Sequence, residues 1–265
     1  MNLKEGLRQL LPARVRPWRI VGGPLRGKLL VTSWRDYPTG IWGHAEPALI
    51  DWFARKVKPG ETWLDVGANY GYTSLALCHH VGETGRVFAF EPLLSTAGHL
   101  VSTRSANRAS QLTIVPLALG DTVDITSVNV PTWKGMAQPA AETQPGAWVE
   151  PILSIALDSL WTHISGLDET ISGIKIDVEG MERQALAGML DILRKHKPKL
   201  VVEIHRSRGV DLPILEPILR EAGYDPAGAL VGADLRSDGN YEFNVTSESS
   251  DCYVQMVESE RGEKD

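Results

Sequence analysis

Residues 62–71, TWLDVGANYG, combine a short apolar strand with a turn that contains two glycines. A helical pattern follows at once over Tyr72–Val81, so this stretch predicts a strand, a tight turn and a helix. Glycine lets backbone approach a ligand closely, and the N-terminus of a following helix favours bound groups. Asp65 lies at the carboxyl end of the strand, where open α/β sheets bind their ligands. The stretch therefore predicts a ligand site.

Strands alternate with helices on both sides of this stretch. Further strands are predicted at 86–90, 112–117, 152–157, 173–178 and 200–204. Helices are predicted at 46–58, 95–107, 182–195 and 213–222. Alternation at this spacing is typical of βαβ units and a parallel sheet, so the fold class is α/β. Segments 241–245 and 253–257 are interpreted as a closing antiparallel pair.

The chain divides into three parts by composition. Residues 1–58 form an N-terminal extension with a short amphipathic helix at 3–11, short strands and the helix at 46–58. A domain at 59–258 and a polar tail at 259–265 follow, and a Pro-rich stretch at 131–151 is interpreted as an excursion over the sheet. The helix at 3–11 could dock on the body, on a membrane or on a second copy in a homo-oligomer.

The amino-acid composition limits the classes of protein to which the chain can belong. The 265 residues are 43% hydrophobic and 23% charged, which is typical of soluble globular proteins, and two cysteines exclude a disulfide scaffold. A net charge of -6 and a pI of about 5.7 do not favour nucleic-acid binding. No apolar run reaches the roughly 18 residues that span a bilayer. No signal peptide is recognisable, so we expect a cytoplasmic protein with no transmembrane segment.

The residues after the first two strands indicate the ligand. Glu91 ends the second strand, where an acid can hold both hydroxyls of a ribose. The turn reads G-x-N-x-G, whereas a dinucleotide site needs G-x-G-x-x-G, so an NAD-dependent oxidoreductase is the less favoured alternative. Asp65 before the glycines would repel a pyrophosphate. The same acid suits a cationic ligand such as the amino group and sulfonium of S-adenosylmethionine (SAM).

Six short motifs occur in order along the chain. They are DVGANYG (65–71), AFEP (89–92), ALGD (118–121), LD (157–158), IKIDVEG (174–180) and VEIH (202–205). Together they resemble the FkbM-type SAM-dependent methyltransferases over about residues 40–225. The resemblance implies the class I methyltransferase fold, a Rossmann-like, mostly parallel sheet of seven strands with helices on both faces. It also implies O-methylation of a small-molecule hydroxyl on a sugar, glycoside or natural product.

The resemblance also implies roles for individual residues in binding SAM. Those expected around its amino-acid part are Asp65, Gly67, Asn69 and Gly71. Glu91 is expected to hold the ribose. The adenine is expected to be bordered by Leu119, Gly120 and Asp121.

Polar residues interrupt the apolar pattern of the fourth and fifth strands. Four of them are expected to meet at the carboxyl ends of the strands, beside the methyl group of SAM: Asp177, Glu179, Glu203 and His205. Burying such charge is costly unless the groups have partners or a task. A structural network in which Lys175 pairs with an acid is one explanation. A catalytically silent adenosine-ligand-binding or assembly module is a separate alternative for the chain, and the intact pairs Asp177–Glu179 and Glu203–His205 argue against it.

The catalytic explanation of this cluster has two versions. In the first, His205 or one of the carboxylates of Asp177, Glu179 and Glu203 is the general base that takes the hydroxyl proton. In the second, these four residues bind Mg or Mn, which orients the acceptor. We favour the protein base. Glu46, just before the core, could also reach the acceptor.

Overall fold

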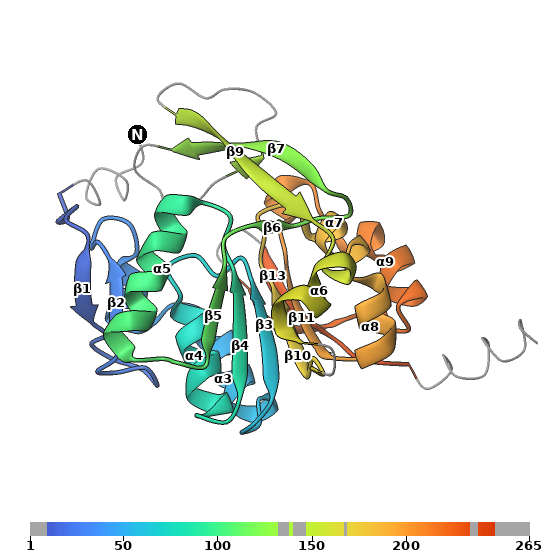
Figure 1. Ribbon diagram of the computed structural model, residues 1–265, viewed down its shortest axis with the longest axis horizontal. Helices are drawn as coiled ribbons and strands as arrows, with labels where there is room; N and C mark the ends of the chain where they lie inside the picture. The colour runs from blue at the N-terminus through green and yellow to red at the C-terminus, as the bar shows by residue number, and fades with distance from the viewer. Residues whose placement is uncertain (1–9, 132–137, 140–146, 167–168, 234–237, 247–265) are drawn as a thin grey trace, which may run out of the picture.

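The computed structural model describes residues 10–131, 138–139, 147–166, 169–233 and 238–246. Its centre is a seven-stranded sheet in the order β12-β13-β11-β10-β3-β4-β5 (Figure 1). The strands are β3 (Thr62–Val66), β4 (Arg86–Phe90), β5 (Leu112–Val115), β10 (Gly173–Ile176), β11 (Lys199–Ile204), β12 (Ala229–Ala233) and β13 (Gly239–Phe243). All neighbours are parallel except β13, which is antiparallel to both β11 and β12. This topology confirms the class I, Rossmann-like α/β fold.

Helices cover both faces of the sheet because the buried strands carry apolar residues on both sides. Trp63 and Ala89 pack toward α3 (Pro47–Lys56), α4 (Tyr72–Val81) and α5 (Leu94–Asn107). Leu64 and Ile174 pack toward the other face, in the cluster that holds apolar residues of α6 (Leu157–Ser165), α7 (Glu182–Ala187), α8 (Leu190–His196) and α9 (Leu212–Glu221). Figure 1 shows these two groups of helices on opposite sides of the sheet.

A second, four-stranded sheet lies outside this core in the order β6-β9-β7-β8. It contains β6 (Ala118–Leu119), β7 (Asp124–Pro131), β8 (Gln138–Pro139) and β9 (Ala147–Ile155), and Figure 1 shows β7 and β9 crossing one end of the central sheet. The strand predicted at 152–157 was therefore wrong in its placement, because this segment pairs with β7 instead of joining the parallel sheet. We refer to β7 and β9 as the arm.

The described part of the N-terminal extension packs against the core. An antiparallel pair, β1 (Arg16–Arg19) and β2 (Leu29–Thr32), is followed by the short helix α2 (Pro38–Trp42). The N–H of Leu29 donates to Asn107 Oδ1 over 2.9 Å, and the N–H of Val31 donates to Thr103 Oγ1 over 3.0 Å. These bonds join β2 to α5. Most of the helix predicted at 3–11 lies outside the described residues.

Two other predictions differ from the structure. The single helix expected at 182–195 is broken into α7 and α8 around Gly188, where an added Cβ would lie 1.7 Å from the carbonyl oxygen of Gly120. β13 lies between β12 and β11 in the sheet, whereas the partner predicted for this segment, at 253–257, lies outside the described residues. Within the described ranges, no helix is both long enough and apolar enough to cross a membrane.

Candidate functional site

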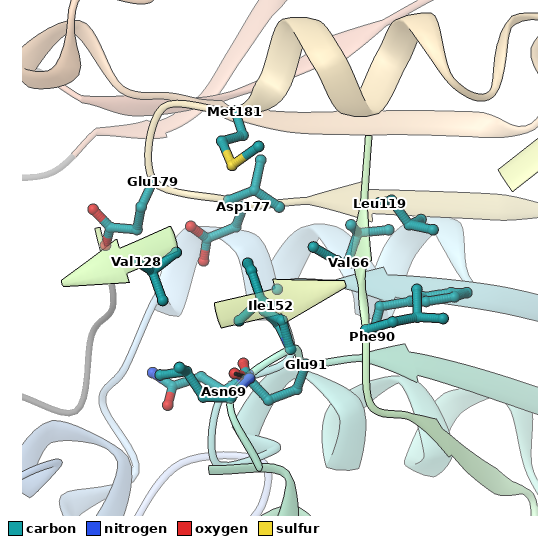
Figure 2. A pocket seen from close by; sticks show the side chains of 16 residues that line it. Val66, Asn69, Phe90, Glu91, Leu119, Val128, Ile152, Asp177, Glu179 and Met181 are labelled. Atoms are coloured by element: carbon teal, nitrogen blue, oxygen red, sulfur yellow. Dashed lines mark hydrogen bonds between the residues drawn. The ribbon is translucent and has the colours of Figure 1, made fainter. Parts of the chain in front are cut away.

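A cavity opens at the carboxyl ends of β3, β4 and β10, where the strand order reverses and open α/β sheets bind ligands. The space between its walls is about 830 Å³, a volume that includes space open to solvent. Figure 2 shows Asn69 and Glu91 on one side, and Asp177, Glu179 and Met181 on the other. Val128 of β7 and Ile152 of β9 also line the cavity, so the arm supplies part of its wall.

The turn after β3 shapes one side of the cavity. Gly67 has a φ of 81°, and an added Cβ would lie 1.7 Å from the carbonyl oxygen of Asp177. Only glycine allows the two chain segments to approach so closely. Asn69 also has a positive φ, of 49°, and its N–H donates to Glu91 Oε2 over 3.0 Å. The N–H of Leu93 donates to Glu91 Oε1 over 3.0 Å, so backbone groups orient this carboxyl. Burial raises the pKa of Glu91 to about 7.

The structure separates the eight predicted cofactor residues into two groups. Those that line the cavity are Gly67, Asn69, Glu91 and Leu119. The others, which do not, are Asp65, Gly71, Gly120 and Asp121. Gly71 precedes α4 as its N-cap with a φ of 91°, and a Cβ at Gly120 would clash with Ser154, so local structure explains a glycine at both positions. Asp121 is exposed. The cofactor-binding roles of all eight residues stay predictions.

Asp65 is completely buried beneath the cavity. Its Oδ2 accepts hydrogen bonds from the hydroxyls of Thr73 at 2.8 Å and Ser74 at 2.6 Å, which lie in the first turn of α4. Its Oδ1 lies 3.2 Å from Nζ of Lys175, and the same Nζ lies 3.3 Å from Asp177 Oδ2. Lys175 is 1% exposed and also donates to the carbonyl of Gly67 over 3.1 Å. The lysine thus joins β3, β10 and the glycine turn through one buried ammonium.

His205 lies close to the other three predicted catalytic residues. Its Nδ1 lies 2.5 Å from Glu182 Oε1, and its Nε2 lies 3.6 Å from Asp177 Oδ1 and 3.9 Å from Glu179 Oε2. Asp177, Glu203 and His205 each place one nitrogen or oxygen atom within 4.8 Å of the others. Burial alone would lower the pKa of His205, but the hydrogen bond to Glu182 and the charges of the nearby carboxylates raise it to about 9. At neutral pH the imidazole therefore carries a positive charge.

Two carboxyl groups border this cluster without a partner of their own. Among the described residues, neither Glu46 nor Glu203 has a side-chain hydrogen bond or an ion pair, and Glu46 Oε2 is closed to solvent. Burial and the charge of Asp177 raise the pKa of Glu203 to about 9, and burial raises that of Glu46 to about 7. Both carboxyls are thus partly or largely protonated at neutral pH.

The sequence predicted that the four catalytic candidates meet but missed Glu182, which contacts His205. Glu182 is fully buried, and its Oε1 also accepts from the N–H of Gly180 over 3.0 Å. An acid in the first turn of a helix is ordinarily explained by the helix dipole, so its sequence position did not single it out. Tyr37, whose pKa is raised by burial and by Glu46, is a second missed neighbour of the cluster. No local sequence pattern marks Tyr37 as a functional residue.

A family model described as methyltransferase FkbM domain matches residues 65–226. This range contains the turn after β3, Glu91 and the Asp177–His205 cluster. It leaves out Glu46 and the rest of the N-terminal extension. A search of the curated proteins found no match to the chain.

Solved structures similar to this chain include a methyltransferase FkbM from Methylobacillus flagellatus KT. It is 20% identical with a TM-score of 0.47, and the match covers 74% of this chain but 51% of that one, so this chain spans about half its length. Fibrillarin from Aeropyrum pernix, in complex with natively bound SAM, is 14% identical with a TM-score of 0.47 and coverages of 87% and 82%. A putative rRNA-methylase from Clostridium thermocellum is 11% identical with a TM-score of 0.46 and coverages of 75% and 94%.

Proposed function

The chain belongs to the FkbM family of SAM-dependent methyltransferases, and on that premise we propose that it methylates a hydroxyl oxygen of a small-molecule acceptor. The observation that carries this proposal is the position of Asp177. Its carboxylate lines the cavity and also belongs to the buried cluster with Lys175 and His205. A ligand in the cavity and an acceptor beside the cluster would meet at this residue. The net charge of -6 supports an acceptor other than a nucleic acid.

Residues of the cavity fit SAM by their chemistry. Glu91 offers an oriented carboxyl for the ribose hydroxyls, and Leu119 with Ile152 offers an apolar surface for the adenine. The turn at Gly67 and Asn69 brings backbone close to the amino-acid part, and the side-chain oxygen of Asn69 is buried without a hydrogen-bond partner. When bound, SAM supplies an electrophilic methyl group on its sulfonium.

We assign the general base to Asp177 and the positioning role to His205. The base must take the hydroxyl proton as the oxygen–carbon bond forms, so it must lie at the cavity. Asp177 does, whereas His205 is 4% exposed and does not line the cavity. His205 carries its own proton at neutral pH, because Glu182 and the nearby carboxylates raise its pKa to about 9. Between His205 and Lys175, the carboxylate of Asp177 has a fixed orientation.

The donor set does not fit a Mg or Mn ion well in this arrangement. Of the three residues that come close enough, His205 is charged at neutral pH and Asp177 already faces the ammonium of Lys175 at 3.3 Å. A metal ligand must be deprotonated, and two positive charges beside the same carboxylate would repel a divalent cation. We therefore derive no step through a metal.

Methyl transfer should accordingly be insensitive to chelators. We expect turnover in excess EDTA to stay within about twofold of the untreated rate, and added Mg or Mn to leave it unchanged. The measurement is the transfer of labelled methyl groups from SAM after dialysis against EDTA. A loss of activity that Mg or Mn restores would contradict the protein-base assignment and favour the metal.

Binding of S-adenosylhomocysteine (SAH) tests the cofactor assignment before any acceptor is known. Titration calorimetry should detect SAH binding and no binding of NAD. Glu91→Ala should weaken SAH binding by roughly ten- to hundredfold, because hydrogen bonds to a charged group contribute about 1.5–3 kcal/mol. Glu216→Ala, which removes an exposed carboxyl of α9, is the control and should bind as the wild type does. Binding of NAD alone would contradict the assignment, and SAH binding without turnover on any hydroxylated acceptor would favour the silent module.

A further inference from the structure

The N-terminal extension carries a charge opposite to that of the whole chain. Residues 1–35 hold eight Lys or Arg and one acid, whereas the net charge of the protein is -6. Five of these cations are exposed and have no ion pair among the described residues: Arg14, Arg16, Arg19, Arg26 and Lys28. The extension therefore concentrates positive charge on an otherwise acidic protein. It lies before residues 65–226, which match the family model.

Three tryptophans form a row beside these cations. The guanidinium of Arg16 lies 3.8 Å from the centre of the Trp18 ring. Trp34 packs edge-to-face between Trp18 and Trp42, with ring centroids 5.8 and 5.4 Å apart. The N–H of Gly22, in the loop after β1, donates to the carbonyl of Trp42 over 3.1 Å. The row thus joins the outer strand β1, which lies at the edge of the molecule in Figure 1, to the end of α2.

Apolar side chains are exposed on the same segments as the cations. Trp42 is 52% exposed and Val21 is 47% exposed, and Val15 is exposed as well. We refer to the five exposed cations with Val15, Val21 and Trp42 as the basic surface. Exposed apolar side chains among cations are characteristic of proteins that bind the membrane interface. There Trp lies at the level of the lipid headgroups, and Lys and Arg are attracted to anionic lipids.

A protein strand or a nucleic acid suits this combination less well. β1 is the outer strand of a two-stranded sheet, and its sequence is Arg-Pro-Trp-Arg. Charges and proline on an edge strand oppose pairing with a strand of another chain, and a second copy would bring like charges together. RNA is bound through phosphate contacts and through bases that stack on aromatic rings. Such binding gives the exposed aliphatic side chains of Val15 and Val21 no role.

We propose that the basic surface binds the headgroup region of an anionic lipid membrane. The cations contact the charged headgroups, while Trp42 and Val21 enter the interface between headgroups and acyl chains. The hydrogen bonds of β2 to α5 hold the extension against the core, so binding orients the whole domain on the membrane. The residues of the basic surface all lie outside the cavity, so failure of this inference would leave the proposed function standing.

Sedimentation with lipid vesicles tests the proposal. The full chain is mixed with vesicles of phosphatidylcholine alone, or of equal parts phosphatidylcholine and phosphatidylglycerol, and the bound fraction gives a partition coefficient. We expect binding to the anionic vesicles only. High salt should abolish it, because the Debye length falls from about 10 Å at 0.1 M to about 3 Å at 1 M. Equal binding to both kinds of vesicle, or binding to neither, would overturn the inference.

Charge variants locate the surface that binds. Arg14→Gln with Lys28→Gln should lower the partition coefficient for anionic vesicles about 30-fold, because each cation near such a membrane contributes about 1 kcal/mol. The control, Arg55→Gln with Lys195→Gln, removes the same charge from exposed positions of α3 and α8. It should bind almost as the wild type does, since charges more than about 10 Å from the membrane are screened at 0.1 M salt. Equal losses in the two variants would contradict the proposed location.

Apolar variants separate a membrane from a nucleic acid. Val21→Ser with Trp42→Ser should weaken vesicle binding by about tenfold or more, because these side chains no longer leave water for the interface. Ile214→Ser with Leu230→Ser removes exposed apolar side chains from α9 and β12 and should have no effect. Thermal unfolding shows whether each variant is folded. Vesicle binding that depends on charge but not on Val21 and Trp42, or binding to a single-stranded RNA in preference to vesicles, would overturn the inference.

Discussion

Asp177→Asn is expected to lower kcat by about 10²–10⁴-fold, the contribution of a positioned general base, while Kd for SAH changes by less than about threefold. The amide keeps the shape of the side chain, so the contact of the Gly67 turn with the backbone of residue 177 should persist. It cannot accept the hydroxyl proton. The measurement combines single-turnover methyl transfer from labelled SAM with calorimetric titration of SAH.

Two further variants separate the base from its surroundings. Asp191→Asn removes an exposed carboxyl of α8 that pairs with Arg194 at 3.5 Å, and it should leave both kcat and Kd unchanged. His205→Gln should lower kcat less than Asp177→Asn, because it removes the positive charge 3.6 Å from Asp177 but leaves the carboxylate itself in place. Turnover in Asp177→Asn close to that of the wild type would remove this residue from the chemical step.

The prediction of the fold from sequence succeeded where local pattern and tertiary structure agree. The segments Thr62–Val66, Tyr72–Val81 and Arg86–Phe90 were located from apolar runs, glycines and helical spacing alone. The arm was missed because its strands do not look like buried strands. In β7 and β9 the outward side chains of Ile125 and Leu153 are apolar and exposed, and the stretch between the strands is rich in proline. The length and the pairing of β7 and β9 depend on contacts within their own sheet, which sequence periodicity does not specify.

Prediction of the site was limited by contacts between distant segments. Alternation along β10 and β11 was enough to place Asp177, Glu203 and His205 together, since parallel neighbours end at the same edge. It could not show that Asp65 faces into the protein, because this depends on the hydroxyls of the α4 first turn and on Lys175 in another strand. Glu46 precedes Glu203 by 157 positions in the sequence. Only the folding of the N-terminal extension brings the two carboxyl groups close enough to interact.

Lys175→Met is expected to have the largest effect on stability of any single substitution in the site. Lys175 is 1% exposed and lies within 3.3 Å of both Asp65 and Asp177. Methionine fills a similar volume but leaves two buried carboxylates without their shared cation. Removing one partner of a buried ion pair costs about 3–5 kcal/mol, which lowers Tm by about 10 °C in a domain of this size. Chemical denaturation monitored by tryptophan fluorescence measures the change.

Lys199→Met is the matched control for this expectation. Lys199 is also a strand lysine and pairs with Glu61, but its side chain is 31% exposed, so its loss should cost no more than about 1 kcal/mol. The double variant Lys175→Met, Asp65→Asn should recover part of the lost stability, because it removes one of the stranded charges. If Lys175→Met were no more costly than Lys199→Met, the buried ammonium would not be what balances Asp65 and Asp177. The carboxylate of the proposed base would then need another source of its fixed position.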